Sequence, residues 1–291
     1  MSPHKLLPTV YVPLDQSEAS KEVIPVASTI AQASGASICY VHAPDELEAA
    51  SDLIEHLHLR REQIRNAVIE QVPGPPDEMI PRFAAQHPNS IIVMPMNASG
   101  REEVRGLGPV SKAVLQRAGC AIVFTPFKAR PGAWDHWKPI HMVLPQDSSA
   151  ECAAAVSPIA GIVHAKNARV TILHVPTYGD LWKTPERAAL PIPRYLDQPQ
   201  HGIRAWQEEF IERLRALANL PESIEIRLVL GMGEPVAEII ETSRAIPADL
   251  IVMPWYRDYP NATVLRPVLA QADCPVMVLP IATAEQATKV A

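Results

Sequence analysis

Short apolar runs alternate with longer amphipathic segments along the whole chain. Runs such as Thr9–Leu14 and Ala121–Thr125 are typical of buried strands, whereas Glu18–Ala33 and Pro76–Gln86 place apolar residues at helical spacing. Because continuous apolar strands separated by helices indicate a parallel sheet covered on both faces, the pattern predicts an α/β fold.

The alternation predicts five strands in each half of the chain. The strands expected in the first half are Thr9–Leu14, Ser37–Val41, Val68–Val72, Ser90–Met94 and Ala121–Thr125, with helices at Glu18–Ala33, Leu47–Ala67, Pro76–Gln86 and Pro109–Arg117. Those expected in the second half are His141–Leu144, Arg169–Leu173, Ile224–Leu230, Leu250–Met253 and Val276–Leu279, with a helix at Ala205–Ala218.

The second half repeats the first. Pro13–Ser17 matches Pro145–Ser149 at an offset of 132 residues, and Ile91–Pro95 matches Leu250–Pro254 at an offset of 159. The larger offset indicates about 27 additional residues in the second copy, from 159 minus 132. We therefore expect two domains. Their bounds are 1–127 for the first domain, 128–139 for a linker, 140–281 for the second domain with an insert at 178–206, and 282–291 for a loose polar tail.

Charge and composition exclude several classes of protein. The net charge of −6 argues against a nucleic-acid-binding surface, and no apolar run is long enough to predict a membrane span or a signal peptide. The cysteines are widely spaced and fit buried thiols in a reducing compartment rather than a metal site or disulfides. We expect a cytoplasmic protein without a nucleic-acid or membrane partner and without a metal.

Polar residues recur where the first two strands of each copy end. Asp15 and Asp147 follow the first strands, and His42 and His174 end the second strands. Ligands of open α/β sheets bind outside the carboxyl ends of the strands, so both pairs are candidate ligand-binding residues. Two other interpretations remain open at this point: Asp15 caps the helix that begins near Glu18, and the histidines have a packing role.

The order of these fragments resembles the universal stress protein family, duplicated as in its tandem members. The resemblance rests on VYVPLDQSEAS, on the His-ended strands ICYVHA and TILHVP, on IIVMP and LIVMP, and on the closing CPVMVLP. It implies two five-stranded α/β domains of the adenine-nucleotide α-hydrolase type. It also implies an internal pseudo-dimer that pairs Ala121–Thr125 with Val276–Leu279, with a higher oligomer left open.

Many members of that family bind ATP through Gly-x2-Gly-x9-Gly-Ser/Thr after the fourth strand, and both copies here depart from this motif. The first copy keeps Gly108, with Gly100 close to the position of the second glycine, but Pro109 replaces the Ser/Thr. The N–H groups of Val110 and Ser111 remain candidates for an anion, and Arg101 could supply charge or lie in a solvated loop. The second copy has no glycine between Pro254 and Thr263. ATP is therefore a possible cofactor of the first domain only.

No catalytic motif stands out, and we expect a protein that is not an enzyme. The sequence favours a non-catalytic, ligand-sensing or stress-response regulator with a small-molecule or protein ligand. One alternative is an ATP-binding member with slow hydrolysis or self-phosphorylation. Another is a docking module that uses the insert 178–206, in which four prolines, two tryptophans and two tyrosines could also form a strap over an apolar surface.

Overall fold

The computed structural model describes residues 9–98, 106–127, 132–176, 202–256 and 261–281. Gly100, Arg101, the tail 282–291 and most of the insert 178–206 lie outside these residues. The chain divides into two compact units, one formed by 1–138 and 257–278 and the other by 139–256 and 279–291. We describe each unit by itself.

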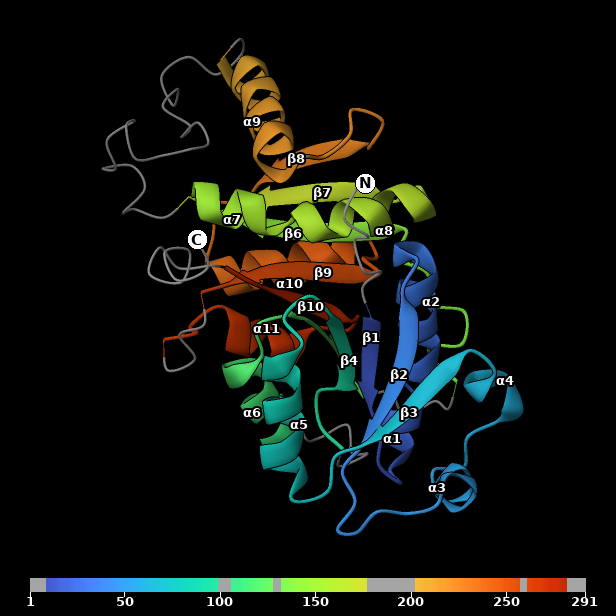
Figure 1. Ribbon diagram of the computed structural model, residues 1–291. Coiled ribbons are helices and arrows are strands. Elements are labelled where there is room, and N and C mark those ends of the chain that lie inside the picture. The colour runs from blue at the N-terminus through green and yellow to red at the C-terminus, as the bar shows by residue number, and fades with distance from the viewer. Residues whose placement is uncertain (1–8, 99–105, 128–131, 177–201, 257–260, 282–291) are drawn as a thin grey trace, which may run out of the picture. The chain divides into compact units, whose positions relative to one another are not determined.

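The strands of the first unit run in the order β3-β2-β1-β4-β5-β10. β1 pairs in parallel with both β2 and β4, so the chain reverses its direction of winding between β1 and β4 (Figure 1). Their bounds are β1 Thr9–Pro13, β2 Ser37–His42, β3 Ala67–Gln71, β4 Ile91–Pro95, β5 Ala121–Thr125 and β10 Val276–Pro280. In such a sheet, the place where strand order reverses is where ligands gather.

The last strand of the second repeat begins in the first unit, which includes Val276–Val278. β10 pairs antiparallel with β5, and Val276 lies opposite Phe124. This confirms the expected pairing of Ala121–Thr125 with Val276–Leu279. The compact units are therefore not identical with the two sequence repeats, because the second repeat supplies the start of a strand to the first unit.

Two of the helices expected in the first copy are divided in the structure. The helix expected over 18–33 is two helices, and Pro25 lies in the first turn of the second of them. The helix expected over 47–67 stops at His56, because a continuous helix could not turn both Leu57 and Leu59 inward, and both are buried. The bounds of the helices of this unit are α1 Glu18–Lys21, α2 Ile24–Ser34, α3 Ala50–His56, α4 Arg61–Ile64, α5 Pro76–Gln86, α6 Pro109–Arg117 and α11 Leu265–Gln271.

The second unit contains four parallel strands in the order β9-β6-β7-β8. In this unit α7 packs against α9, and α10 packs against β6. The bounds of its elements are β6 His141–Gln146, α7 Ala150–Ala155, the short 3-10 helix η1 Ser157–Ile159, α8 Ala160–Lys166, β7 Arg169–His174, α9 Gly202–Ala218, β8 Ile226–Leu230, α10 Pro235–Ala245 and β9 Leu250–Trp255. β6 pairs in parallel with both β7 and β9, just as β1 pairs with both β2 and β4. The strand order therefore reverses between β6 and β9 as it does between β1 and β4.

The described part of the linker is anchored to the first unit by its aromatic residues. Trp134 and Trp137 are both 8% exposed. The Thr29 hydroxyl of α2 donates a hydrogen bond to the Trp137 carbonyl at 3.4 Å, and the N–H of Gly132 donates to the Glu22 carboxylate at 3.0 Å. The indole rings therefore serve as buried anchors for the segment that follows β5.

Candidate functional site

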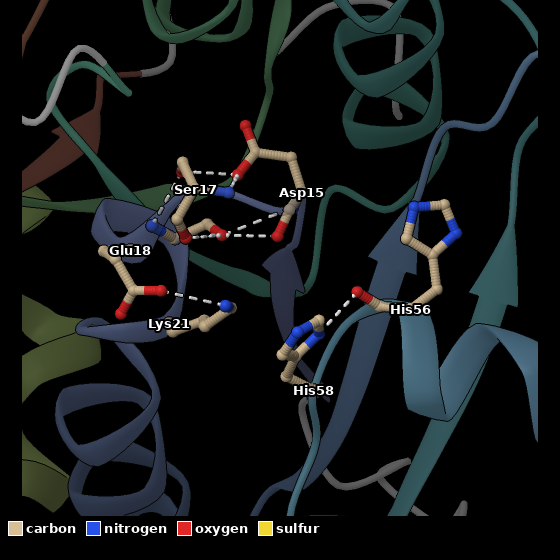
Figure 2. A network of polar contacts seen from close by, with 7 residues as sticks. Asp15, Ser17, Glu18, Lys21, His56 and His58 are labelled. Carbon is tan, nitrogen blue, oxygen red and sulfur yellow. Dashed lines mark hydrogen bonds and ion pairs between the residues drawn. The ribbon is translucent and has the colours of Figure 1, made fainter.

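Asp15 holds the helix cap that follows β1 and remains exposed. Its Oδ1 accepts hydrogen bonds from the N–H and the hydroxyl of Ser17, at 2.9 and 2.5 Å (Figure 2). Ser17 in turn is the N-cap of α1 and accepts from the N–H of Ser20. In Figure 2 the second carboxylate oxygen of Asp15 carries no contact to the residues drawn. One oxygen therefore supports the cap, and the residue as a whole stays exposed to solvent.

Replacing Ser17 with alanine should lower the free energy of unfolding by about 1 kcal/mol, because an N-cap acceptor is lost. Asp15→Asn should cost less, because the asparagine side-chain oxygen can still accept from the N–H of residue 17. Urea unfolding followed by circular dichroism measures both values. A larger loss for Asp15→Asn than for Ser17→Ala would contradict this division of roles.

His42 joins the ends of β1 and β2. The ring is 8% exposed, and its Nδ1 donates to the Leu14 carbonyl at 2.8 Å. Because that carbonyl can only accept, Nδ1 carries the proton in this arrangement. The geometry matches the packing interpretation of this histidine, because the ring links the end of β2 to the backbone that follows β1, next to Asp15.

A polar cluster beside His42 was not found from the sequence. His56 of α3 donates from Nδ1 to Glu48 at 2.9 Å, and its Nε2 contacts the Gln16 amide. Gln71, at the end of β3, holds Glu48 through a pair of hydrogen bonds to its backbone, at 2.9 and 2.8 Å. The cluster ties together the carboxyl ends of all three strands on this side of the sheet. Its signal in the sequence is weak, because only the positions of Gln16 and Gln71 after apolar runs indicate it.

The loop after β4 bonds to itself where it leads into α6. The N–H of Gly108 donates to the Met96 carbonyl at 2.7 Å, and the Ser111 hydroxyl donates to the Pro95 carbonyl at 2.9 Å. A Cβ at Gly108 would lie 3.2 Å from the Cβ of Asn97, so this close approach favours glycine. The structure thus uses the Gly108 N–H and the Ser111 hydroxyl within the protein.

Val110 occupies the first turn of α6, after Pro109. The helix is capped by Gly108 without a side-chain hydrogen bond. The first N–H groups of a helix lack intrahelical partners and favour an anion. Of the ATP-loop candidates in the described part of the chain, the backbone at Val110 and Ser111 therefore keeps the geometry that suits a phosphate best.

Asp147 in the second copy repeats the cap of Asp15 but has a further partner. Its Oδ1 accepts from the N–H and the hydroxyl of Ser149, at 2.9 and 2.6 Å. Its Oδ2 accepts from the phenol of Tyr256 at 2.6 Å. Burial acts to raise the pKa of Asp147, but the hydrogen bonds from Ser149 and Tyr256 outweigh it, and the pKa is lowered. Burial and the same carboxylate raise the pKa of Tyr256.

His174 is fully buried and has the same structural position as His42. Its Nδ1 donates to the Gln146 carbonyl at 2.9 Å, and the Ser148 hydroxyl lies 3.3 Å from the same nitrogen. The rings of Phe210 and Trp206, both on α9, lie 5.6 and 6.3 Å away by centroid. The aromatic side chains of α9 therefore pack beside the buried imidazole. The geometry again matches a packing role.

The turn Gly231–Gly233 begins like a dinucleotide-binding motif, but the side chain of Glu238 from the same unit lies against its backbone. Glu238 of α10 accepts from the N–H of Met232 at 3.2 Å, and a Cβ at Gly233 would lie 2.6 Å from the Glu238 carboxylate. An internal carboxylate thus occupies the position at which a phosphate would meet this backbone. The segment is therefore an ordinary turn between β8 and α10.

The described residues contain neither a metal-binding cluster nor a membrane-spanning helix. They hold no group of three or more His, Cys, Asp or Glu side chains arranged to bind a metal ion. In the same parts of the chain, no helix is long and apolar enough to cross a membrane.

Comparison with known proteins identifies the architecture. The model of the universal stress protein family matches twice, at residues 8–126 and 141–280. A universal stress protein from Archaeoglobus fulgidus DSM 4304 has a similar structure, with a TM-score of 0.66 and 18% identity, over 94% of this chain and 96% of that one. A functionally unknown protein from Pseudomonas aeruginosa PAO1 gives a TM-score of 0.62 at 14% identity, over 94% and 93% of the two chains.

A further solved structure, described as a universal stress protein from Pseudomonas aeruginosa UCBPP-PA14, gives a TM-score of 0.60 at 14% identity, over 94% of both chains. At these identities the likeness concerns the fold alone. A search of curated protein sequences finds no significant match.

Proposed function

Because the chain belongs to the universal stress protein family, we propose that it acts without turnover, as a regulator that senses a small ligand at the end of β1. The family fold supports a stress-response or ligand-binding role. We define the first strand-end site as Asp15, His42, Gly108, Val110 and Ser111. The observation that carries the proposal is the exposed Asp15 carboxylate, of which one oxygen supports the α1 cap and the other has no contact to the residues drawn in Figure 2.

The loop after β4 favours a ligand that is not a nucleoside triphosphate. Binding of phosphates by a loop requires backbone N–H groups that point outward. Here Pro109 has no N–H, and the Gly108 N–H is bonded to Met96. A ligand that donates a hydrogen bond to Asp15 through a hydroxyl or an amino group needs none of these phosphate contacts.

The rival function, ATP binding with slow hydrolysis or self-phosphorylation, is favoured by one observation. The first turn of α6 begins at Pro109 with no side chain capping it, so the N–H groups of Val110 and Ser111 are oriented as in an anion site. In this alternative the ATP phosphates would lie at α6, and Arg101 would supply charge.

Mass spectrometry of small molecules released from the freshly purified, denatured protein tests the proposal, followed by calorimetric titration with ATP and magnesium. We expect no stoichiometric nucleotide and no heat of binding at micromolar ATP. A stoichiometric nucleotide whose binding is weakened by both Asp15→Ala and Arg101→Ala would instead support the rival function. Ser51→Ala, which changes an exposed residue of α3, is the control for both variants.

A further inference from the structure

β3 and β8 are edge strands among the described residues. β3 pairs in parallel with β2 and ends the strand order of the first unit, and β8 pairs in parallel with β7 and ends that of the second unit. Neither strand has a second neighbouring strand within the described parts of the chain. An edge strand presents a row of backbone N–H and carbonyl groups to which a further strand can add.

The direction of these backbone groups follows from the hydrogen bond just after each strand. The N–H of Val72 donates to the His42 carbonyl of β2 at 2.8 Å, and the N–H of Gly231 donates to the His174 carbonyl of β7 at 2.9 Å. Because successive residues of a strand direct their backbone groups to opposite sides, every second residue of each strand points away from the paired strand. The residues that point outward in this way are Ala67, Ile69 and Gln71 of β3 and Ile226, Leu228 and Leu230 of β8.

The helix α4 packs on one face of β3, and the side chains on the other face are exposed. The Tyr40 hydroxyl of β2 donates to the Gln63 carbonyl of α4 at 3.1 Å, and Tyr40 is the neighbour of Ile69 in the sheet. The helix therefore lies on the Ile69 face, and Val68 and Glu70 point to the opposite face. Val68 is 60% exposed, and Glu70, the one charged residue of β3, is exposed as well.

β8 has the same arrangement with the opposite charge. The ring of His174, which is the neighbour of Leu230 in the sheet, lies 5.6 Å from Phe210 of α9 by centroid, so α9 packs on the Leu230 face. Arg227 and Val229 point to the other face. Arg227 is the one charged residue of β8 and is exposed, and Val229 is partly exposed. Each edge strand thus presents one aliphatic and one charged side chain on its open face, and the two charges are of opposite sign.

We propose that β3 of one copy of this chain pairs antiparallel with β8 of a second copy, in the register that places Glu70 opposite Arg227. Val68 then lies opposite Val229, and all five residues of each strand are paired. An opposite-charge pair and an aliphatic pair at directly opposite positions both stabilise a pair of strands. The two edges of this chain are therefore complementary to each other.

The same register satisfies the backbone and accommodates the helices. Ile69 lies opposite Leu228, so the outward backbone groups of the two strands face one another, and each such residue pair can exchange two hydrogen bonds. Because opposite residues of an antiparallel pair point to the same face, α4 of one copy and α9 of the other lie on one side of the joined sheet. A shift by one residue would turn Glu70 to the face on which α9 packs, so the register is well specified.

Pairing of like edges lacks this complementarity. Two copies of β3 offer Glu70 no basic residue in the facing strand, and two copies of β8 offer Arg227 no acidic one. When unlike edges pair, one β3 and one β8 stay free at the ends of the assembly, so a third copy can add to it. The association therefore continues beyond two chains.

Charge reversal in the intact chain tests this pairing by sedimentation velocity over a concentration series. The average mass of the wild type should rise with concentration and pass that of two chains. Glu70→Arg and Arg227→Glu should each raise the dissociation constant about ten-fold, because each creates like charges at directly opposite positions. Glu241→Arg on α10 and Arg82→Glu on α5 reverse exposed charges outside the two strands and should leave the dissociation constant unchanged.

Mixing the two edge variants tests whether the contact joins different copies. An equimolar mixture of Glu70→Arg and Arg227→Glu should regain the wild-type dissociation constant. The new arginine of one chain meets the new glutamate of the other, and the two unchanged residues still form a pair. A wild type that stays a single chain up to about 1 mM would overturn the proposal. So would a discrete dimer that responds to only one of the two reversals, or a mixture that associates no better than its components.

Discussion

Replacing Phe124 with alanine is expected to lower the free energy of unfolding by about 3–5 kcal/mol. Phe124 is fully buried in the middle of the first unit, on β5, opposite Val276 of β10. Its removal takes away apolar burial, and the cavity that remains removes contacts on both sides of the β5–β10 pair. Urea unfolding followed by circular dichroism measures the loss.

Val68→Ala is the matched control, because Val68 is also a strand residue but is 60% exposed on β3. Its loss of stability should stay below about 1 kcal/mol, which is the span of strand propensity. If the two variants lost equal stability, β5 would not lie in the core between β4 and β10.

Replacing Trp206 with alanine is expected to destabilise the second unit by a similar amount, about 3–5 kcal/mol. Trp206 is 4% exposed in the first turns of α9, and its ring lies 5.5 Å from Phe210 and 6.3 Å from His174 by centroid. The indole therefore closes the aromatic layer over the buried histidine. The same unfolding measurement applies, with far-ultraviolet circular dichroism as the signal.

Glu208→Ala changes an exposed residue of the same helix and should alter the free energy of unfolding by no more than about 0.5 kcal/mol. This comparison also tests where the insert ends. A small effect of Trp206→Ala would indicate that the tryptophan belongs to a surface segment, as the expected insert range 178–206 implies, rather than to the packed helix α9.

Most strands could be predicted from the sequence, because apolar runs with flanking polar residues carry the signal of a buried strand within a few neighbours. The bounds of the helices were harder to predict from the sequence. Pro25 is a local signal for the division between α1 and α2, but the end of α3 depends on burying both Leu57 and Leu59, which only tertiary packing decides. Propensity therefore gives the existence of such an element more reliably than its length.

Some residues of the candidate sites could likewise be predicted from the sequence, and others could not. Asp15 and Asp147 could be found because they repeat at a constant offset after apolar strands. Tyr256 could not be found as a partner of Asp147, since the two residues are 109 positions apart and only the β6–β9 pairing brings their strand ends together. Gln146 could not be singled out either. A glutamine is unremarkable in a sequence, and only its burial without a hydrogen-bond partner for the amide makes it unusual.

The pairing of β10 with β5 has a consequence for biosynthesis. β5 leaves the ribosome about 150 residues before its partner, given the register of Phe124 with Val276. At about 5–20 residues per second, the edge of β5 is uncovered for on the order of ten seconds or more. An uncovered apolar edge can pair with another nascent chain. Slowing translation between the repeats should therefore lower the yield of folded protein, and a chaperone that shields strand edges should restore it.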